Sequence, residues 1–191
     1  MFLPTELECT ECHGALDTDY RPSFVKVYTS EGVRNATSFH KKCKQCCIQY
    51  YESYSCKGST VTYTEGCVQD KYILMSSKTA FETLYLRTIS DLIEVAAVTF
   101  TSAAESYGVT HNMTFEKQRL EDAYFIYRLI QSSGNLVITR NPTSCRLDVE
   151  QACKEYLDAL HINSNEFIDH SCSVNGCAQG FVVADGIEKV S

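Results

Sequence analysis

The stretches Cys9-Thr10-Glu11-Cys12 and Cys43-Lys44-Gln45-Cys46 organise the amino-terminal part of this chain. Each stretch places two thiols in one tight turn, and two such turns that face each other supply four sulfur ligands. Four thiolates are the tetrahedral set that zinc prefers, so we predict a zinc site formed by Cys9, Cys12, Cys43 and Cys46. The 30 residues between the pairs exceed the usual spacing, yet a β-hairpin can bring their ends together.

The alternative to a metal site is a pair of disulfides or a set of free thiols in a core. Seven of the eleven cysteines lie in the first 67 residues, whereas residues 68–144 contain none. Small disulfide-stabilised domains spread their bridges through the core, so this clustering favours metal binding. The amino terminus has neither the basic start nor the apolar run of a secretory signal. We therefore expect an intracellular protein in a reducing compartment.

The 191-residue chain has the composition of a folded protein with unevenly distributed charge. Hydrophobic residues make up 44% of the chain, and the net charge of −7 argues against bulk affinity for nucleic acid. Residues 21–44, however, contain six basic side chains and one acidic side chain. We expect a local basic surface on an acidic body. No apolar stretch is long enough to span a membrane, so no membrane partner is expected.

Residues up to about 75 have the composition of β-strands separated by turns. The turn Ser30-Glu31-Gly32 predicts a hairpin, because Gly32 can adopt a positive φ. Stretches rich in tyrosine and β-branched residues predict further strands downstream. We expect strands over residues 24–29, 33–39, 48–55, 61–63 and 71–75.

The hydrophobic periodicity becomes helical after these strands. Thr79 and Glu82 have the spacing of a capping box, which predicts a helix that starts at Thr79. Ser102 predicts the cap of a shorter helix that ends at Gly108. Two more helices are expected over residues 115–131, where apolar side chains lie on two sides, and over residues 148–160.

These patterns predict an α+β fold in three parts. Residues 1–75 are expected to form a small antiparallel, zinc-ribbon-like β-sheet, and residues 76–161 a helical subdomain. Residues 162–191 are expected to form a partial second cysteine cluster, in which Cys172, Cys177 and nearby His170 are candidate metal ligands that lack a fourth partner. Other residues have either a structural or a ligand interpretation: Cys47, His40, Cys56 and Cys67.

The basic and aromatic residues beside the second cysteine pair also have two interpretations. Lys41, Lys42 and Lys44 can offset the negative charge of a zinc centre with four thiolates, or they can contact phosphate groups. The tyrosines of residues 50–54 can stack on bases or pack against neighbouring strands. We keep both interpretations open for each group.

Motifs for catalysis are missing from the sequence. It contains no glycine-rich phosphate loop, no nucleophile elbow, and no metalloprotease or deaminase signature. The carboxylates show no spacing typical of a metal-dependent nuclease. We therefore do not expect an enzyme, and we expect no small-molecule substrate.

The cysteine pairs and their flanking residues resemble the cysteine-cluster modules associated with KDZ (Kyakuja-Dileera-Zisupton) DNA transposases. The resemblance rests on the first cysteine pair, residues 25–29, the run from Phe39 to Cys46, residues 48–51 and residues 76–83. Residues 172–186 resemble the start of the second cluster that follows in such proteins. The resemblance implies a nuclear, zinc-chelating module for DNA or chromatin recognition, with the transposase chemistry in a separate RNase H-like domain. The chain stops within the second cluster, which suggests either a fragment of a longer transposase or a shortened gene model.

Together these observations predict a zinc-binding recognition module of a KDZ-transposase-like mobile-element protein. DNA is the expected partner, with other transposon or chromatin proteins as further partners. The expected phosphate contacts are Lys26, Arg34, Lys41, Lys42 and Lys44. The alternative is an intracellular protein–protein interaction module in which zinc is purely structural and the helix over residues 115–131 docks a partner.

Overall fold

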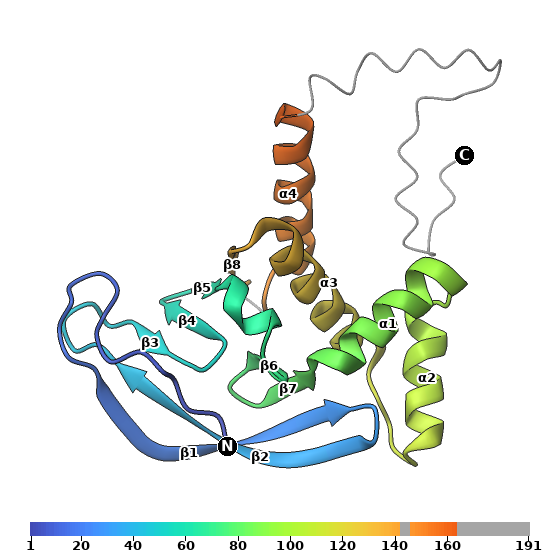
Figure 1. Ribbon diagram of the computed structural model, residues 1–191, viewed down its shortest axis with the longest axis horizontal. Coiled ribbons are helices and arrows are strands. Elements are labelled where there is room, and N and C mark those ends of the chain that lie inside the picture. The colour runs from blue at the N-terminus through green and yellow to red at the C-terminus, as the bar shows by residue number, and fades with distance from the viewer. Residues whose placement is uncertain (142–145, 164–191) are drawn as a thin grey trace.

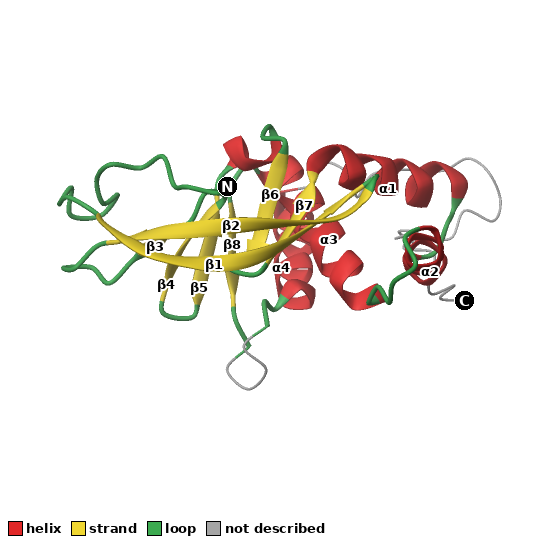
Figure 2. Ribbon diagram, turned by 90° about the horizontal axis from the view of Figure 1, so that it is seen from below, coloured by secondary structure: helices red, strands yellow, loops and turns green. Residues whose placement is uncertain are grey.

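The structure is a computed structural model that describes residues 1–141 and 146–163 and has a mixed α+β architecture (Figures 1 and 2). Its strands are β1 (Asp17–Thr29), β2 (Gly32–Lys42), β3 (Gln49–Tyr50), β4 (Tyr54–Lys57), β5 (Thr60–Tyr63), β6 (Tyr72–Ser76), β7 (Thr79–Glu82) and β8 (Leu136–Thr139). Its helices are α1 (Thr83–Ala96), α2 (Phe100–Thr110), α3 (Lys117–Ser133) and α4 (Val149–Asn163), with a 3₁₀ turn, η1 (Glu65–Val68).

Within the described residues, the strands form one eight-stranded sheet in the order β6-β7-β1-β2-β3-β4-β5-β8. All neighbouring strands are antiparallel except β1 and β7, which are parallel. The sheet curls, and it is larger than the small amino-terminal sheet that the sequence predicts (Figure 1). Side chains join its distant parts, since the Tyr63 hydroxyl on β5 donates to the Met75 carbonyl on β6 at 3.0 Å.

The β1–β2 hairpin confirms the predicted turn. Its strands are longer than predicted, because β1 already begins at Asp17 and β2 continues to Lys42. Gly32 has a φ of 117°, which favours glycine, and the Thr29 hydroxyl donates to its carbonyl at 2.9 Å. A side chain at Gly32 would also approach His111 Nδ1 to 3.1 Å. The Tyr107 hydroxyl on α2 donates to the Thr29 carbonyl at 3.1 Å. The turn of the hairpin is therefore held against the helices, while its open end lies far from them (Figure 1).

Helix α3 lies at the centre of the main hydrophobic core. Its apolar residues are buried on two sides, as the sequence predicts, and they include Leu120, Ile126 and Ile130, each at most 1% exposed. The elements that cover α3 belong to this chain: α1, α2, α4, η1 and β8. The suggestion that this helix docks a partner protein is therefore wrong, because its apolar surface is already buried inside the fold.

The predicted helix start at Thr79 is also wrong. Residues Thr79–Glu82 form β7, and α1 begins at Thr83 without a side-chain cap. Ala80 and Phe81 are fully buried, and β7 pairs with both β1 and β6. Non-local strand pairing and burial thus outweigh a capping motif that contributes about 1 kcal/mol.

Three other elements differ from the sequence prediction. The expected strand over residues 48–55 is instead two short strands, β3 and β4, joined by a turn in which the Tyr51 N–H donates to the Tyr54 carbonyl at 2.8 Å. Strand β8, which the sequence analysis missed, pairs with β5. Helix α2 continues past Gly108, where a side chain would approach the Met113 carbonyl oxygen to 2.7 Å.

The proposed division at residue 75 stays a prediction. The sheet crosses it, because β7 and β8 lie after it, and one main core includes residues from both sides. No helix in the described part of the chain is long and apolar enough to cross a lipid bilayer.

Candidate metal centre

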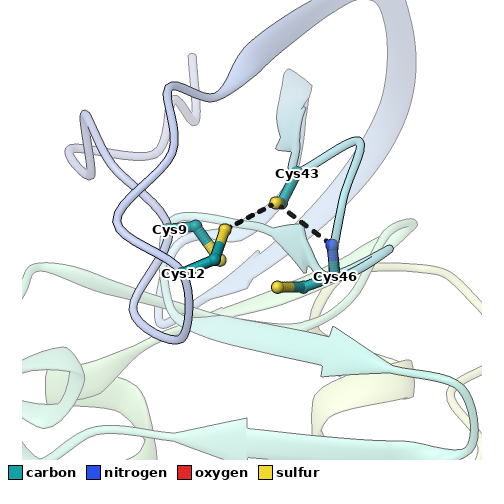
Figure 3. A group of neighbouring side chains, drawn as sticks. All are labelled: Cys9, Cys12, Cys43 and Cys46. Atoms are coloured by element: carbon teal, nitrogen blue, oxygen red, sulfur yellow. Dashed lines mark hydrogen bonds between the residues drawn. The ribbon is translucent and has the colours of Figure 1, made fainter.

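The two cysteine pairs meet at the open end of the β1–β2 hairpin (Figure 3). The Sγ atoms of Cys9, Cys12, Cys43 and Cys46 all lie within 4.8 Å of one another, and those of Cys12 and Cys43 are 3.5 Å apart. Sulfurs that bind one zinc ion at about 2.3 Å in a tetrahedron are about 3.8 Å apart. The four thiols therefore already have the spacing of one metal's ligand set, and they can hold a metal ion.

The first knuckle, residues 9–14, closes through its own backbone. The His13 N–H donates to the Cys9 carbonyl at 2.9 Å, and the Cys9 N–H donates to the Gly14 carbonyl at 2.9 Å. His13 has a φ of 56°, in the left-handed region. This residue reverses the chain directly after Cys12, so both thiols of the pair point to the same side.

The second knuckle, residues 43–48, repeats this pattern at the end of β2. The Cys47 N–H donates to the Cys43 carbonyl at 3.0 Å, and the Cys43 N–H donates to the Ile48 carbonyl at 2.9 Å. Cys47 has a φ of 59°, which matches His13 in the first knuckle. The Cys46 N–H also donates to the Cys43 Sγ at 3.3 Å, which ties the two ends of the pair together (Figure 3).

Tyr50 forms a hydrogen bond to one of the four cysteines, a role that was not predicted from the sequence. Its hydroxyl donates to the Cys9 Sγ at 3.3 Å and accepts from the Thr10 N–H at 3.0 Å. The side chain is only 2% exposed. The bond joins residues 41 positions apart, so no local sequence signal reveals it. Sequence analysis gave the tyrosines of this region only base stacking or strand packing.

The thiols differ in their affinity for protons. Hydrogen bonds to the Cys9 thiol, above all from the Tyr50 hydroxyl and then from backbone N–H groups, lower its pKa from 9.0 to about 6. The hydrogen bond with the Cys12 thiol, together with burial, raises the pKa of Cys46 well above its ordinary value. Four thiolates this close repel each other, so the metal-free cluster retains protons. A bound cation removes this repulsion and stabilises all four sulfurs as thiolates.

The metal centre has its own small core, separate from the main one. Cys9, Cys43, Ile48 and Tyr50 form its buried part, and the half-buried residues around it are Cys12, Leu16 and Cys46. Only Ile48 and Tyr50 in this buried set are large and apolar. Apolar burial at this end is therefore small compared with the main core around α3.

The remaining described cysteines do not join the cluster. Cys47 is exposed, Cys56 donates to the Gly58 carbonyl at 3.5 Å, and burial raises the pKa of Cys67 to about 12. His40, the other rival ligand, stacks on Tyr51 with ring centroids 5.4 Å apart. All eight described cysteines are free thiols rather than disulfides. The predicted second cluster of His170, Cys172 and Cys177 lies outside the described residues.

The five predicted phosphate contacts are spread along the hairpin and the second knuckle. Arg34 forms an ion pair with Glu31 next to the hairpin turn. Lys44 Nζ lies 2.6 Å from Asp17 Oδ2, and this bond raises the pKa of Lys44. The remaining three residues are Lys41, whose Nζ donates to the Glu6 carbonyl at 2.5 Å, and the exposed residues Lys26 and Lys42.

Comparison with known proteins identifies the family but gives no characterised relative. No curated protein and no solved structure matches the chain. Residues 1–115 match the family described as a CxC5-like cysteine cluster associated with KDZ transposases. This family is a cysteine-cluster module rather than a catalytic domain, and the matched range contains all four converging cysteines. The chain therefore belongs to the CxC5-like cysteine-cluster family associated with KDZ transposases.

Proposed function

We propose that this chain is a zinc-binding recognition module of a KDZ-transposase-like mobile-element protein and that it binds DNA in the nucleus. The observation that carries the proposal is the convergence of the four Sγ atoms at the end of the β1–β2 hairpin. In this proposal the chain recognises DNA, while the transposition chemistry belongs to another domain.

The ligand set supports zinc and supports a structural role for it. Four soft thiolates in a tetrahedral arrangement favour zinc or iron among the common metals. With four protein ligands the metal has no open position for a substrate or water, so it contributes folding energy rather than catalysis. The small core of the metal centre agrees with such a role, since Ile48 and Tyr50 offer little apolar burial on their own.

Local charge supports contact with DNA despite the net charge of −7. Phosphate binding requires a few well-placed cations rather than a basic protein overall. The proposed contacts remain those expected from the sequence: Lys26, Arg34, Lys41, Lys42 and Lys44. Lys41 and Lys42 directly precede the second knuckle and Lys44 lies within it, so a metal that orders this knuckle also positions them.

Metal analysis of a reduced preparation tests the zinc assignment. We expect one zinc per chain and a colourless protein, whereas an iron centre would be coloured. Cys43→Ser should lose the metal. Its matched control, Cys47→Ser, should retain it, because that neighbouring thiol is exposed and lies outside the cluster. Iron, or full metal content in Cys43→Ser, would exclude the proposed zinc site.

DNA binding is tested separately with a fluorescently labelled duplex and the zinc-loaded protein. We expect binding at low salt that weakens as salt is added, because each phosphate contact releases counterions. Charge-reversing Lys→Glu variants at the proposed contacts should abolish it. If the fully metal-loaded protein does not bind the duplex at low salt, the DNA proposal is refuted while the zinc proposal stands.

A protein–protein interaction module is the second candidate. The acidic net charge favours it, as do the ion pairs that Arg34 and Lys44 form with carboxylates of this chain. Its docking surface would not be α3, which is buried. Retained metal combined with absent DNA binding is the result that would favour this candidate.

A further inference from the structure

A basic hollow lies between β1, β2 and the second knuckle. Arg21 of β1, His40 and Lys42 of β2, and Lys44 of the knuckle line it. The other described residues that line the hollow are Asp17, which is acidic, and Thr18 and Cys47. Three permanent cations thus surround one carboxylate on a chain whose net charge is −7.

An irregularity in β1 brings Arg21 to this hollow. Asp19 pairs with His40 and Ser23 pairs with Ser38, so three residues of β1 stand opposite the single residue Phe39. Two extra residues in one strand force the backbone to bend, as in a β-bulge. Arg21 lies within this irregular stretch, is exposed, and lines the hollow together with Lys42 at the end of β2. Such features often redirect a side chain toward a functional site.

The carboxylate in the hollow holds Lys44 only weakly. The ion pair between Lys44 and Asp17 is 2.6 Å long, but the two side chains are 82% and 56% exposed. Exposed pairs of this kind contribute about 0–1 kcal/mol, because water and salt screen them and ordering two flexible side chains costs entropy. An incoming anion can therefore recruit Lys44 at little cost.

The other predicted contacts cannot join this site. Lys26 pairs with Asn35, and Arg34 pairs with Val27, so Lys26 and Arg34 lie on opposite faces of the hairpin. At about 3.3 Å per strand residue, Arg34 lies roughly 26 Å along β2 from Lys42. The Lys41 ammonium already donates to a backbone carbonyl. The residues that line the hollow therefore differ from the five phosphate contacts predicted from the sequence.

We infer that the hollow lined by Arg21, His40, Lys42 and Lys44 binds one phosphate of the DNA backbone. This inference rests on the proposed DNA-binding function and specifies where the duplex is held. Arg21 provides a planar fork that matches two phosphate oxygens, and the lysines act as point charges. His40 also lines the hollow, and its ring stacks on Tyr51. Because the knuckle supplies Lys44, the phosphate site lies directly beside the metal centre.

The test measures duplex binding by fluorescence anisotropy with the zinc-loaded full chain. The variant Arg21→Gln/Lys42→Gln should weaken binding about tenfold at roughly 0.1 M salt, and it should lower the slope of log affinity against log salt by about 0.9. The matched control Lys78→Gln/Arg87→Gln removes the same charge from two exposed residues outside the proposed contacts and should change both quantities less. The single variant Arg21→Gln should also weaken binding. It tests the hollow without altering the knuckle, because Arg21 is distant in sequence from every cysteine of the cluster.

A second measurement separates this inference from the proposed function. Inorganic phosphate is titrated into the zinc-loaded protein while the NMR signals of His40 are followed, and we expect them to shift. If the duplex binds and the two double variants lower its affinity equally, the hollow is not the phosphate site, although the DNA-binding proposal stands. If only inorganic phosphate binds, the hollow is an anion site that does not hold DNA, and both the inference and the DNA proposal fail. If neither ligand binds, both proposals fail.

Discussion

Removal of the metal is expected to unfold the two knuckles and leave the main core folded. The knuckles comprise residues 9–14 and 43–48, and their buried apolar support is limited to Ile48 and Tyr50. The main core instead packs α1, α2 and α3 against the curled sheet. The opposite end of the β1–β2 hairpin is held by Tyr107 of α2. Loss of the metal should therefore remain local.

The magnitudes support this expectation. Ordering the backbone of twelve knuckle residues costs about 12–24 kcal/mol. Burial of Ile48 and Tyr50 contributes about 3–6 kcal/mol. A structural zinc ion contributes about 10–16 kcal/mol of apparent binding free energy. Burial alone falls well short of the ordering cost, whereas the apparent free energy of zinc binding already includes that cost and still favours the ordered state. The knuckles should thus be ordered with zinc and disordered without it.

Hydrogen exchange followed by mass spectrometry is the suitable assay, because it reports local opening. Reduced protein is compared with and without a chelator. Peptides from the two knuckles should lose protection after chelation, while peptides from β6, β7 and α3 should keep it. Cys43→Ser should reproduce the chelated pattern, and Cys47→Ser should not. Loss of protection in α3, or unchanged knuckles without metal, would refute the reasoning.

Three further predictions concern individual residues and the extent of the fold. Tyr50→Phe should lower metal affinity roughly 10–100-fold in a chelator competition, because it removes the hydrogen bond to Cys9. Without metal, the pKa of the Cys9 thiol is about 6, so protons begin to compete with the metal for its sulfur as the pH falls through about 6. In Tyr50→Phe this competition should begin at higher pH, and an unchanged profile would exclude the role of the hydroxyl. Gly108→Ala should destabilise the protein by about 1–3 kcal/mol in denaturant titrations, because its new side chain meets a backbone carbonyl oxygen at 2.7 Å. Gly66→Ala has open space and should be near neutral. Truncation after residue 115 should give an unfolded protein by circular dichroism, since it removes α3 from the core; a folded truncated chain would contradict this.

Local signals predicted the cluster of four cysteines well. Each CxxC turn is specified by adjacent residues, and only the meeting of the two turns required long-range structure. The hairpin that brings them together was also predictable, because its turn needs a residue such as Gly32 with a positive φ. The support from Tyr50 was not predictable, since its hydrogen bond depends on the path of β3 beside the first knuckle.

Non-local pairing explains the errors in the fold. Thr79 and Glu82 have a real helix-capping spacing, yet β7 forms there because β1 offers a parallel partner and the core buries Phe81. Strand β8 was missed because its pairing with β5 joins residues more than seventy positions apart. Sequence periodicity describes one segment at a time, so it cannot weigh a local cap against a partner strand that arrives from elsewhere.

The position of the metal centre links the two proposals. The residues that line the basic hollow come from two sources: Arg21 and His40 belong to the hairpin, whereas Lys44 belongs to the second knuckle. The hairpin is anchored to the main core at its far end, so it should keep its residues in place when the metal is absent. The knuckle is expected to depend on the metal for its order. Zinc would therefore control recognition by completing a phosphate site that the rest of the fold builds only in part.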